Sequence, residues 1–485
     1  GRAVAFAGDI NGDNVDDLII GASEADPAGS FSGSTYVVFG SPNGFDAAVS
    51  LATLDGSTGF RLDGVASSDR SGSAVSAAGD VNDDGVDDLL IGAPGADSNN
   101  EPNAGSSYVV FGQVGTFDPV ISLSTLDGSN GFRLDAYDSG DRSGVSVSGA
   151  GDVNGDGIDD LIIGATEVDL DEDEVGAAYV VFGRDTAFEA VIDLGSLDGT
   201  TGFRLNGVGE SDYTGVSVSG GVDVNGDGLD DLIIGADGAD VPARDSGNTY
   251  VVFGRDTAFE AVIDPATLDG VIGFRLDGGD RENSGNAVAG AGDINGDGID
   301  DLIVGAYSAD PDGLQLAGRS YVVFGRDDGF DPVISLPMLN GNNGFRLDGA
   351  AAFDNSGAAV SAAGDVNGDG IDDLIIGAYG AGPNAVEYAG SSYVVFGRRD
   401  GFEASINLST LSGDTGIRLD GVATQDFSGR AVSGGGDFNG DGFDDLVIGA
   451  RNADPAGLSS GSTYVVFGQR YEVFKDRFEA QNSGR

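Results

Sequence analysis

A nine-residue acidic segment recurs seven times along this chain of 485 residues, at almost constant spacing. The copies are DINGDNVDD (9–17), DVNDDGVDD (80–88), DVNGDGIDD (152–160), DVNGDGLDD (223–231), DINGDGIDD (293–301), DVNGDGIDD (365–373) and DFNGDGFDD (437–445). Their first residues lie 71, 72, 71, 70, 72 and 72 positions apart. A fixed period is typical of repeat architectures, in which each unit buries its apolar surface against its neighbours. We therefore expect one array of seven similar units.

The period that begins at residue 72 contains four segments with the character of β-strands. They are GSAVSAAGDV (72–81), DLLIGA (88–93), SSYVVFG (106–112) and GFRLD (131–135), the last preceded by a connection containing FDPVISLSTLDG (117–128). Each segment is short, rich in β-branched or aromatic residues and bounded by turn residues. In none of them do apolar residues recur with the period of a helix. Four antiparallel strands in each of seven periods predict an all-β fold, a seven-bladed β-propeller with one acidic loop per blade. An open solenoid is the alternative, but its end repeats are usually atypical, and here they are ordinary.

The strand count predicts how the ring closes. We expect the propeller to occupy residues 1–469 and a C-terminal tail to occupy 470–485. The chain has seven acidic loops but only six GFRLD-type strands, which contain Phe60, Phe132, Phe203, Phe274, Phe345 and Ile417. Our hypothesis is that the tail segment Tyr471–Phe478 supplies the seventh outer strand. Otherwise that strand lies upstream of Gly1 or comes from a neighbouring molecule.

The acidic loop has the chemistry of a calcium site. In residues 152–160, the oxygen-bearing side chains of Asp152, Asn154 and Asp156 stand at positions 1, 3 and 5 and alternate with turn residues, so they converge. Ile158 at position 7 offers its main-chain carbonyl, and Asp160 at position 9 closes the ring. About six or seven hard oxygen ligands suit Ca²⁺, whereas Mg²⁺ prefers a tighter octahedron with retained water. We therefore predict about seven calcium ions, one per blade.

The predicted ligands occupy positions 1, 3, 5, 7 and 9 of every loop. They are Asp9, Asn11, Asp13, Val15, Asp17, Asp80, Asn82, Asp84, Val86, Asp88, Asp152, Asn154, Asp156, Ile158, Asp160, Asp223, Asn225, Asp227, Leu229, Asp231, Asp293, Asn295, Asp297, Ile299, Asp301, Asp365, Asn367, Asp369, Ile371, Asp373, Asp437, Asn439, Asp441, Phe443 and Asp445. The alternative is a set of Asp/Asn/Gly turns without metal. Turn formation alone does not require Asp at position 9 in every copy, which favours the metal.

Two loops depart from the consensus. Asn14 replaces Gly at position 6 of the first loop, and Asn is the non-Gly residue that best tolerates positive φ. Asp83 replaces Gly at position 4 of the second loop and adds charge. We expect all seven loops to bind calcium, the first most weakly.

Composition excludes several classes of function. The formal net charge is −58, from 81 acidic and 23 basic residues, and seven bound divalent ions would leave about −44. Such a surface argues against nucleic acid or anionic membrane as a partner. Cys, His and Trp are absent, which removes thiolate nucleophiles and the commonest general base. No apolar run approaches the ~18 residues of a membrane-spanning helix, so membrane insertion is not expected.

The loop and its flanking strands resemble the FG-GAP family, whose repeats form the seven-bladed propeller of integrin alpha subunits. AGDVNDDGVDDLLIGAP (78–94) and SSYVVFG (106–112) carry this resemblance, and FSG (427–429) echoes the start of the family repeat. The resemblance implies calcium in hairpin loops on one rim and partners on the opposite rim. Most copies here lack the Pro of the family pattern, and the period exceeds that of the integrin repeat. The integrin ligand site therefore cannot be transferred.

We expect an extracellular or cell-surface adhesion or recognition module, without enzymatic activity, for an unidentified protein or glycan. Its binding surface would include the variable stretches 23–34, 94–105, 166–177, 237–248, 307–319, 379–391 and 451–462. One alternative is a structural subunit of a surface layer or filament, which would self-assemble through an open blade edge. Another is a polysaccharide-acting lyase. The arginines of the GFRLD strands are expected to form ion pairs between blades.

Overall fold

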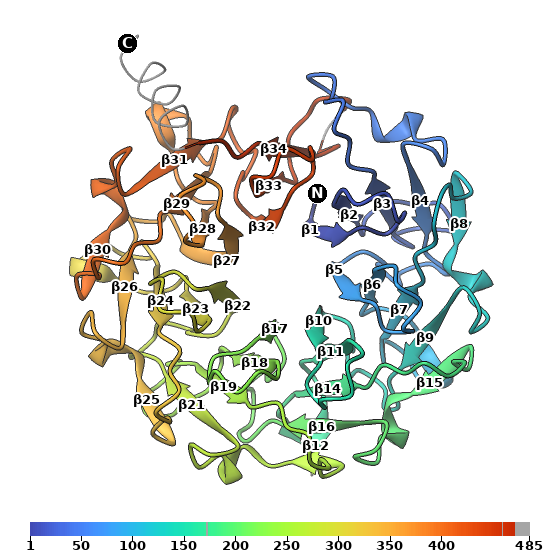
Figure 1. Ribbon diagram of the computed structural model, residues 1–485, viewed down its shortest axis with the longest axis horizontal. Coiled ribbons are helices and arrows are strands. Elements are labelled where there is room, and N and C mark those ends of the chain that lie inside the picture. The colour runs from blue at the N-terminus through green and yellow to red at the C-terminus, as the bar shows by residue number, and fades with distance from the viewer. Residues whose placement is uncertain (171–172, 458, 471–485) are drawn as a thin grey trace.

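The computed structural model of the protein describes residues 1–170, 173–457 and 459–470. Its sheets stand as seven blades around a central axis (Figure 1). The blades are numbered here in chain order, so that blade 1 begins with β1 and blade 7 with β32. The predicted seven-bladed β-propeller is thus confirmed.

Each blade is built outward from an inner strand beside the axis. The inner strands are β1 (Ala3–Gly8), β5 (Ala74–Gly79), β10 (Ser146–Gly151), β17 (Val218–Val222), β22 (Ala287–Gly292), β27 (Ser356–Gly364) and β32 (Ala431–Gly436). The second strands are β2 (Asp17–Ala22), β6 (Asp88–Ala93), β11 (Asp160–Ala165), β18 (Asp231–Ala236), β23 (Asp301–Ala306), β28 (Asp373–Ala378) and β33 (Asp445–Ala450). The third strands are β3 (Ser34–Val38), β7 (Ser106–Val110), β14 (Ala177–Val181), β19 (Asn248–Val252), β24 (Arg319–Val323), β29 (Ser391–Val395) and β34 (Ser462–Val466). The fourth strands are β4 (Gly59–Asp63), β9 (Gly131–Asp135), β16 (Gly202–Asn206), β21 (Gly273–Asp277), β26 (Gly344–Asp348) and β31 (Gly416–Asp420).

Five blades carry a fifth strand that the sequence analysis missed. These short strands are β8 (Val120–Ser122), β15 (Val191–Asp193), β20 (Val262–Ile263), β25 (Val333–Ser335) and β30 (Ser405–Asn407). Each lies in the connection between the third and fourth strands of one blade and pairs in parallel with the fourth strand of the preceding blade. The prediction of four antiparallel strands per blade was therefore incomplete. The long connection adds a strand to a neighbour instead of forming a loop.

Short 3-10 turns complete the repeat. After the fifth-strand position come η1 (Leu51–Thr53), η3 (Leu123–Thr125), η4 (Leu194–Ser196), η5 (Pro265–Thr267), η7 (Leu336–Met338) and η9 (Leu408–Thr410). Between second and third strands lie η2 (Ser98–Asn100), η6 (Pro311–Gly313) and η8 (Pro383–Ala385), and in blade 3 the short strands β12 (Asp169–Leu170) and β13 (Asp173–Glu174). Among the described residues, none of these helical turns has the length or apolar character needed to cross a membrane.

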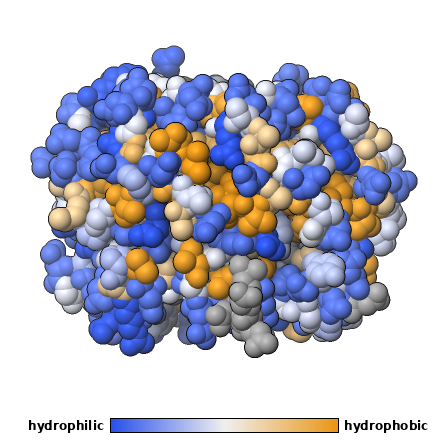
Figure 2. Space-filling view, turned by 90° about the horizontal axis from the view of Figure 1, so that it is seen from below, coloured by the Kyte–Doolittle hydropathy of each residue, from blue (hydrophilic) through white to orange (hydrophobic). Residues whose placement is uncertain are grey.

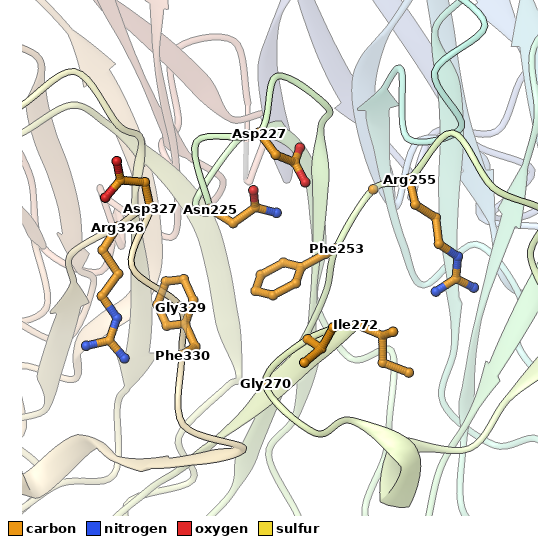
Figure 3. Close-up of a pocket in the computed structure, with 12 residues that line it drawn as sticks. Asn225, Asp227, Phe253, Arg255, Gly270, Ile272, Arg326, Asp327, Gly329 and Phe330 are labelled. Carbon is orange, nitrogen blue, oxygen red and sulfur yellow. The ribbon is translucent and has the colours of Figure 1, made fainter.

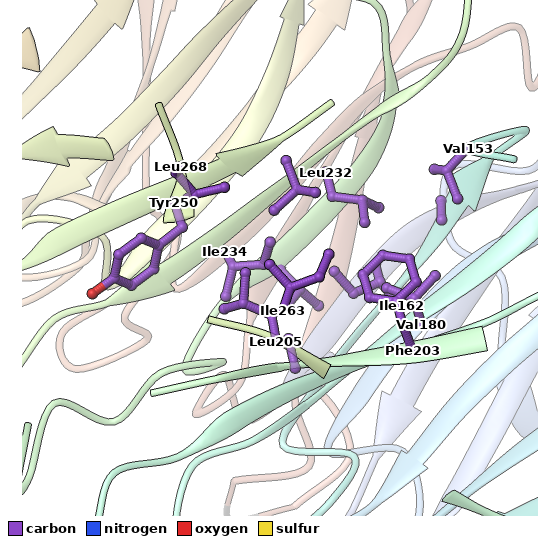
Figure 4. Close-up of a cluster of buried hydrophobic side chains, with 14 of the residues drawn as sticks. Val153, Ile162, Val180, Phe203, Leu205, Leu232, Ile234, Tyr250, Ile263 and Leu268 are labelled. Carbon is purple, nitrogen blue, oxygen red and sulfur yellow. The ribbon is translucent and has the colours of Figure 1, made fainter. Parts of the chain in front are cut away.

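The core consists of apolar layers between neighbouring blades. Second strands such as β11 are buried along their whole length because both faces pack against another blade. Figure 4 shows one such layer, in which Ile162 and Phe203 of blade 3 meet Leu232 of blade 4. Fully burying a side chain of this size is worth about 1.5–3 kcal/mol. On the outer wall, apolar residues gather between two hydrophilic rims (Figure 2).

Blade 7 packs against blade 1 and closes the ring. Val4 and Leu18 of blade 1 share an apolar cluster with Phe438 and Val447 of blade 7. Within the described residues, blade 7 contains three strands, β32, β33 and β34. The predicted seventh outer strand, Tyr471–Phe478, lies outside the described residues.

Candidate metal centres

The seven acidic loops all lie on one rim of the propeller. Each connects the inner strand of its blade to the second strand, so that Asp160, the last residue of the third loop, is also the first residue of β11. Because the strands of a blade alternate in direction, the stretches between second and third strands lie on the opposite rim. Strand topology therefore places the loops and the variable stretches as the sequence predicted.

Two loop carboxylates shape the turn itself. In the third loop, Oδ1 of Asp152 accepts from the amide of Asp156 at 3.0 Å, and Oδ2 accepts from that of Gly157 at 2.8 Å. Oδ1 of Asp156 accepts from the amide of Ile158 at 3.1 Å. Aspartate commonly winds turns through such bonds to nearby amides. Positions 1 and 5 therefore have a structural role with or without a cation.

The position-9 aspartates are the buried acids of the site. Asp160 is 0% exposed, and its carboxylate accepts hydrogen bonds from the amides of Gly183 at 2.8 Å and Val153 at 3.1 Å. The side-chain amide of Asn154, at position 3, donates to the same carboxylate at 3.3 Å. Loss of hydration on burial raises the pKa of Asp160 to about 8, and the negative charges of Asp156 and Asp152 add to the effect.

In the other six loops the position-9 carboxylate likewise accepts hydrogen bonds from a glycine amide just beyond the third strand and from the position-3 asparagine. Their position-9 residues are Asp17, Asp88, Asp231, Asp301, Asp373 and Asp445, all 0% exposed. Burial raises the pKa of Asp17, Asp88, Asp231 and Asp301 to about 8, that of Asp445 to about 7, and that of Asp373 well above its ordinary value. No arginine or lysine forms an ion pair with these seven carboxylates among the described residues.

The oxygen atoms of the loops are of the kind that a hard cation prefers. The acidic side chains, however, are not already gathered around one point. Within the described residues, no three acidic side chains converge closely enough to form a preformed metal cluster. Positions 3 and 9 are in contact in every loop, whereas the carboxylate of position 1 turns toward loop amides. In the sixth loop, Oδ1 of Asn367 is buried without a hydrogen-bond partner. A cation bound there would satisfy that oxygen and balance the charge of Asp373.

The backbone accommodates both departures from the loop consensus. Asn14 at position 6 has φ of +65°, and Asp83 at position 4 has φ of +57°. Both positions take glycine in most copies because positive φ is strained for other residues. Asn14 therefore has the positive φ that asparagine tolerates better than other non-glycine residues.

Position 8 has a role that the sequence analysis missed. Oδ2 of Asp230 in blade 4 accepts a 2.8 Å hydrogen bond from the amide of Asp152, position 1 of the blade 3 loop. The same bond recurs around the whole ring. The pairs, amide first, are Asp9–Asp87, Asp80–Asp159, Asp152–Asp230, Asp223–Asp300, Asp293–Asp372, Asp365–Asp444 and Asp437–Asp16. The signal was present in the sequence, because Asp stands at position 8 in all seven loops although the ligand pattern does not use it.

A pocket of about 370 Å³ opens beside the loop of blade 4. Asn225 and Asp227 of that loop line its upper edge, and Phe253 lies near its centre (Figure 3). Arg255 and Arg326 line it as well, and each guanidinium stacks on a phenylalanine of its own connection, at 4.0 and 4.6 Å from the ring centre. The pocket thus combines oxygen-bearing side chains, aromatic rings and arginine guanidinium groups.

Five of the seven stretches on the opposite rim begin with the same turn, in which an aspartate accepts a hydrogen bond from a main-chain amide five or six residues later. Oδ1 of Asp26 accepts from the amide of Phe31 at 2.7 Å, and Oδ1 of Asp240 accepts from that of Asp245 at 2.7 Å. Asp97, Asp310 and Asp454 make the equivalent bond in their blades. The residues between this aspartate and its partner amide, referred to as the tip of the stretch, differ from blade to blade.

The prediction that the GFRLD arginines pair between blades was wrong. Arg133 pairs with Asp135, two residues along the same strand, at 2.6 Å, and Arg275 pairs with Asp277 at 2.6 Å. Side chains two apart on a strand lie on the same face, so the pair forms within one strand. Arg204 makes no such pair because Asn206 stands in the place of the aspartate.

The FG-GAP repeat model matches the chain seven times. The matches cover residues 1–38, 71–110, 143–181, 214–252, 284–323, 356–395 and 428–466, together more than half of the chain. The chain belongs to the FG-GAP repeat family. Every FG-GAP match runs from the inner strand of a blade through its acidic loop to its third strand. The fourth and fifth strands lie outside the matched FG-GAP segments.

FG-GAP relatives include two kinds of larger protein. The chain is 34% identical over 170 residues to bovine phosphatidylinositol-glycan-specific phospholipase D, and this alignment covers 35% of the chain and 19% of the relative. It is 34% identical over 193 residues to mouse integrin alpha-IIb, an alignment that covers 38% of the chain and 16% of the relative. It is 28% identical over 330 residues to integrin alpha pat-2 of Caenorhabditis elegans, an alignment that covers 67% of the chain and 25% of the relative. The matched part is thus a quarter or less of each of these relatives.

Proposed function

We propose that this FG-GAP propeller is a calcium-binding recognition module that works outside the cell or at its surface. One calcium ion in each acidic loop would stabilise the ring, and the opposite rim would bind a protein or glycan. The observation that carries the calcium proposal is the position-9 aspartate. In all seven loops this carboxylate is 0% exposed. Burying a charge is strongly unfavourable unless a partner of opposite charge or a metal compensates it.

Calcium would supply that compensation. The ion would be held by the side-chain oxygens of positions 1, 3, 5 and 9 and the main-chain carbonyl of position 7, a hard donor set of the kind that calcium prefers. When bound, it neutralises the buried charge and ties the two ends of the loop together. Extracellular calcium is abundant enough to fill sites of modest affinity, which supports a location outside the cell.

Calcium titration by calorimetry, with thermal melting in calcium and in chelator, tests this proposal. We expect about seven sites and a large fall in melting temperature on chelation. A site held at a hundredfold excess over its dissociation constant adds about 2.7 kcal/mol. A melting temperature that is the same in calcium and in chelator would refute the metal proposal.

Recognition is the role that the opposite rim supports. Its stretches differ at their tips while the strands that carry them repeat from blade to blade, and a constant scaffold that carries variable loops is typical of binding proteins. The resemblance to integrin alpha subunits points the same way. The test is a panel of glycans and cell-surface proteins, screened in calcium and again in chelator. Binding to a defined partner that is lost on substituting the tips would support the proposal, and binding that survives those changes would contradict it.

We propose no catalytic activity for this propeller. The aligned part is 19% of the bovine phospholipase D, and the chain contains no histidine as a general base. We therefore expect no release of product from phosphatidylinositol-glycan substrates. A measurable calcium-dependent turnover would overturn this part of the proposal.

A further inference from the structure

The junction of blades 7 and 1 brings two arginines together on the rim opposite the acidic loops. Arg2 and Arg430 each stand one residue before an inner strand, β1 and β32, and these strands lie side by side near the axis (Figure 1). Arg430 stacks on Tyr379, the first residue after the second strand of blade 6, with its guanidinium 4.6 Å from the ring centre. Arg451 holds the place of Tyr379 in blade 7. The repeat therefore places Arg2 beside a second arginine, as it places Arg430 beside a tyrosine.

The equivalent positions at the other six junctions hold no second pair of like charges. They are Ser73 with Ser23, Val145 with Pro94, Val216 with Thr166, Asn286 with Asp237, Ala358 with Tyr307 and Arg430 with Tyr379. Two arginines at these positions are thus particular to the junction of blades 7 and 1, and the repeat itself does not require them.

The ionisation of Arg2 reflects this neighbour. Burial lowers the pKa of Arg2, and the positive charge of Arg451 lowers it further. Glu24 opposes this effect, while Arg70 and Arg430 add smaller contributions in the same direction as Arg451. A like charge has such an influence only at short range, so the four arginines lie near one another. Arg2, Arg70, Arg430 and Arg451 are all exposed and are referred to below as the arginine cluster.

The described residues supply little negative charge to the arginine cluster. Its one ion pair among them joins Arg2 to Glu24 at 3.9 Å, and these side chains are 40% and 71% exposed. An exposed pair of this kind contributes little. Asp69, which precedes Arg70, accepts instead from the amide of Ala66 at 2.7 Å. Four of the 23 basic residues of a strongly acidic chain therefore gather where they have almost no acidic partner.

Aromatic rings flank the arginine cluster on both sides. The guanidinium of Arg70 lies 5.9 Å from the ring centre of Phe31, which is 44% exposed. On the other side, the ring of Tyr379 lies 6.2 Å from that of Phe427, which in turn lies 5.8 Å from that of Tyr388. Tyr388 is 40% exposed. The cations thus stand between ring faces that are open to a ligand.

We propose that the arginine cluster binds the carboxylate of an acidic sugar. This inference rests on the recognition role proposed above and names the class of glycan that the opposite rim binds. Guanidinium groups hold carboxylates through paired hydrogen bonds, and the ring faces of Phe31 and Tyr388 would pack against the C–H groups of neighbouring sugar rings. Charges in water are screened beyond about 8–10 Å at physiological ionic strength. The cluster therefore attracts an anionic group although the whole chain carries a charge of −58.

Calorimetric titration of two sugar acids tests the proposal. The probes are trigalacturonate and sialyllactose, added to the full chain in calcium. We expect saturable binding of at least one of them, at one molecule per chain, and at least tenfold weaker binding of its methyl ester, which lacks the charge. If neither sugar binds, the proposal is overturned. A tetraglutamate peptide that binds as tightly as the better sugar would also overturn it, because the site would then recognise an acidic protein segment.

Variants locate the site. Arg451→Gln should weaken sugar binding at least tenfold, while Arg281→Gln should leave it unchanged. Arg281 is a matched control because it is also exposed, and its amide donates to Arg244 in the blade 4 stretch of the same rim. Phe31→Asn should weaken binding at least threefold, since asparagine tolerates the φ of +54° at this position but offers no ring. Unchanged binding by Arg451→Gln would overturn the site.

Modification of arginines by phenylglyoxal, followed by mass spectrometry, shows whether the protein itself fills the cluster. Arg2 and Arg451 should react as readily as Arg281 in the free chain, and bound sugar should slow their reaction at least tenfold. If they are already unreactive without sugar, another segment of the protein covers them and the proposal fails. A partner that binds through the variable tips but is neutral, or is insensitive to Arg451→Gln, would refute this site and leave the recognition role intact.

Discussion

The main-chain amide of Asp437 donates a 2.7 Å hydrogen bond to Oδ2 of Asp16 and so links the last blade to the first across 421 positions of sequence. The same bond joins every other pair of neighbouring blades. At the other junctions that include a fifth strand, inter-blade pairing such as that of β16 with β20 adds to the contact. Between blades 7 and 1 the described residues provide no such pairing. Among the described residues, the Asp16 contact therefore carries a larger share of that junction.

Asp16→Ala should destabilise the propeller more than the matched change Asp230→Ala. Leaving the partly buried amide of Asp437 without an acceptor costs about 1–3 kcal/mol. Asp230→Ala breaks the same bond between blades 3 and 4, where β20 also holds the junction. Urea denaturation in saturating calcium measures both losses, with the exposed Asp46→Ala as a neutral control. Equal losses for Asp16→Ala and Asp230→Ala would contradict this account of ring closure.

The metal-free protein should become less stable as pH rises. Burial raises the pKa of Asp160 from 3.8 to about 8, and four further position-9 aspartates share that value. Between these two pKa values the folded state binds more protons than the unfolded state, so the free energy of unfolding falls as pH rises through that window. Bound calcium would take the place of the proton and remove most of the dependence.

Thermal melts between about pH 5 and pH 8, in chelator and in calcium, measure this dependence. The melting temperature should fall with pH in chelator and change little in calcium. A metal-free melting temperature that rises across this range would show that these carboxylates are not protonated in the fold.

The repeat made the architecture predictable from the sequence. Seven copies of the acidic loop predicted seven blades. Segments such as DLIIGA could be recognised as the second strand of each blade, because a strand that is buried on both faces is apolar throughout. The fifth strands were not predictable in the same way. Val262–Ile263 is only two residues long, and its pairing with β16 depends on how adjacent blades are placed. A segment that short carries no periodicity of its own.

The sequence predicted which residues form the acidic loops but not the contacts that these loops make between blades. Asp159 and Asp160 are neighbours of the same residue type, yet one contacts the loop of the preceding blade and the other is buried in its own loop. Their different roles follow from opposite side-chain directions at the start of β11, which a sequence pattern of consecutive acids does not reveal. The arginines of the outer strands were assigned to the wrong partners for a different reason, because the pairing of Arg133 with Asp135 follows from the alternation of side chains along a strand and was overlooked in the sequence.

The pair Asp159 and Asp160 allows a sharp test of the ligand assignment. Asp160→Asn removes a predicted ligand, so calorimetry should count one calcium ion fewer than in the unchanged chain. Asp159→Asn removes a charge of the same sign from the adjacent residue but leaves the predicted ligand set intact, so the number of calcium ions should be unchanged. If both variants lose one ion, or neither does, position 9 is not a specific ligand.

A buried ionic network in blade 5 offers a last prediction, because blade 2 provides its control. Arg319 is 13% exposed at its side chain and pairs with Glu282 at 2.7 Å and with Asp348 at 2.6 Å. The hydroxyl of Tyr321 also donates to Glu282 at 2.6 Å. Blade 2 has Ser106 in place of Arg319 and Asp69 in place of Glu282. Blade 5 therefore has a charged arginine and glutamate where blade 2 has a serine and an aspartate. The blade fold does not require this ionic network.

Glu282→Gln should therefore cost stability, because it leaves the buried Arg319 with one acidic partner. Removing one partner of a buried pair typically costs about 3–5 kcal/mol, and we expect a loss below that range because Asp348 remains. The double change Glu282→Asp with Arg319→Ser restores the arrangement of blade 2 and should recover most of the loss. Urea denaturation of the single variants Glu282→Asp and Arg319→Ser, and of the double variant that combines them, gives their coupling energy. Simple additivity of the two single losses would mean that Arg319 and Glu282 do not stabilise each other.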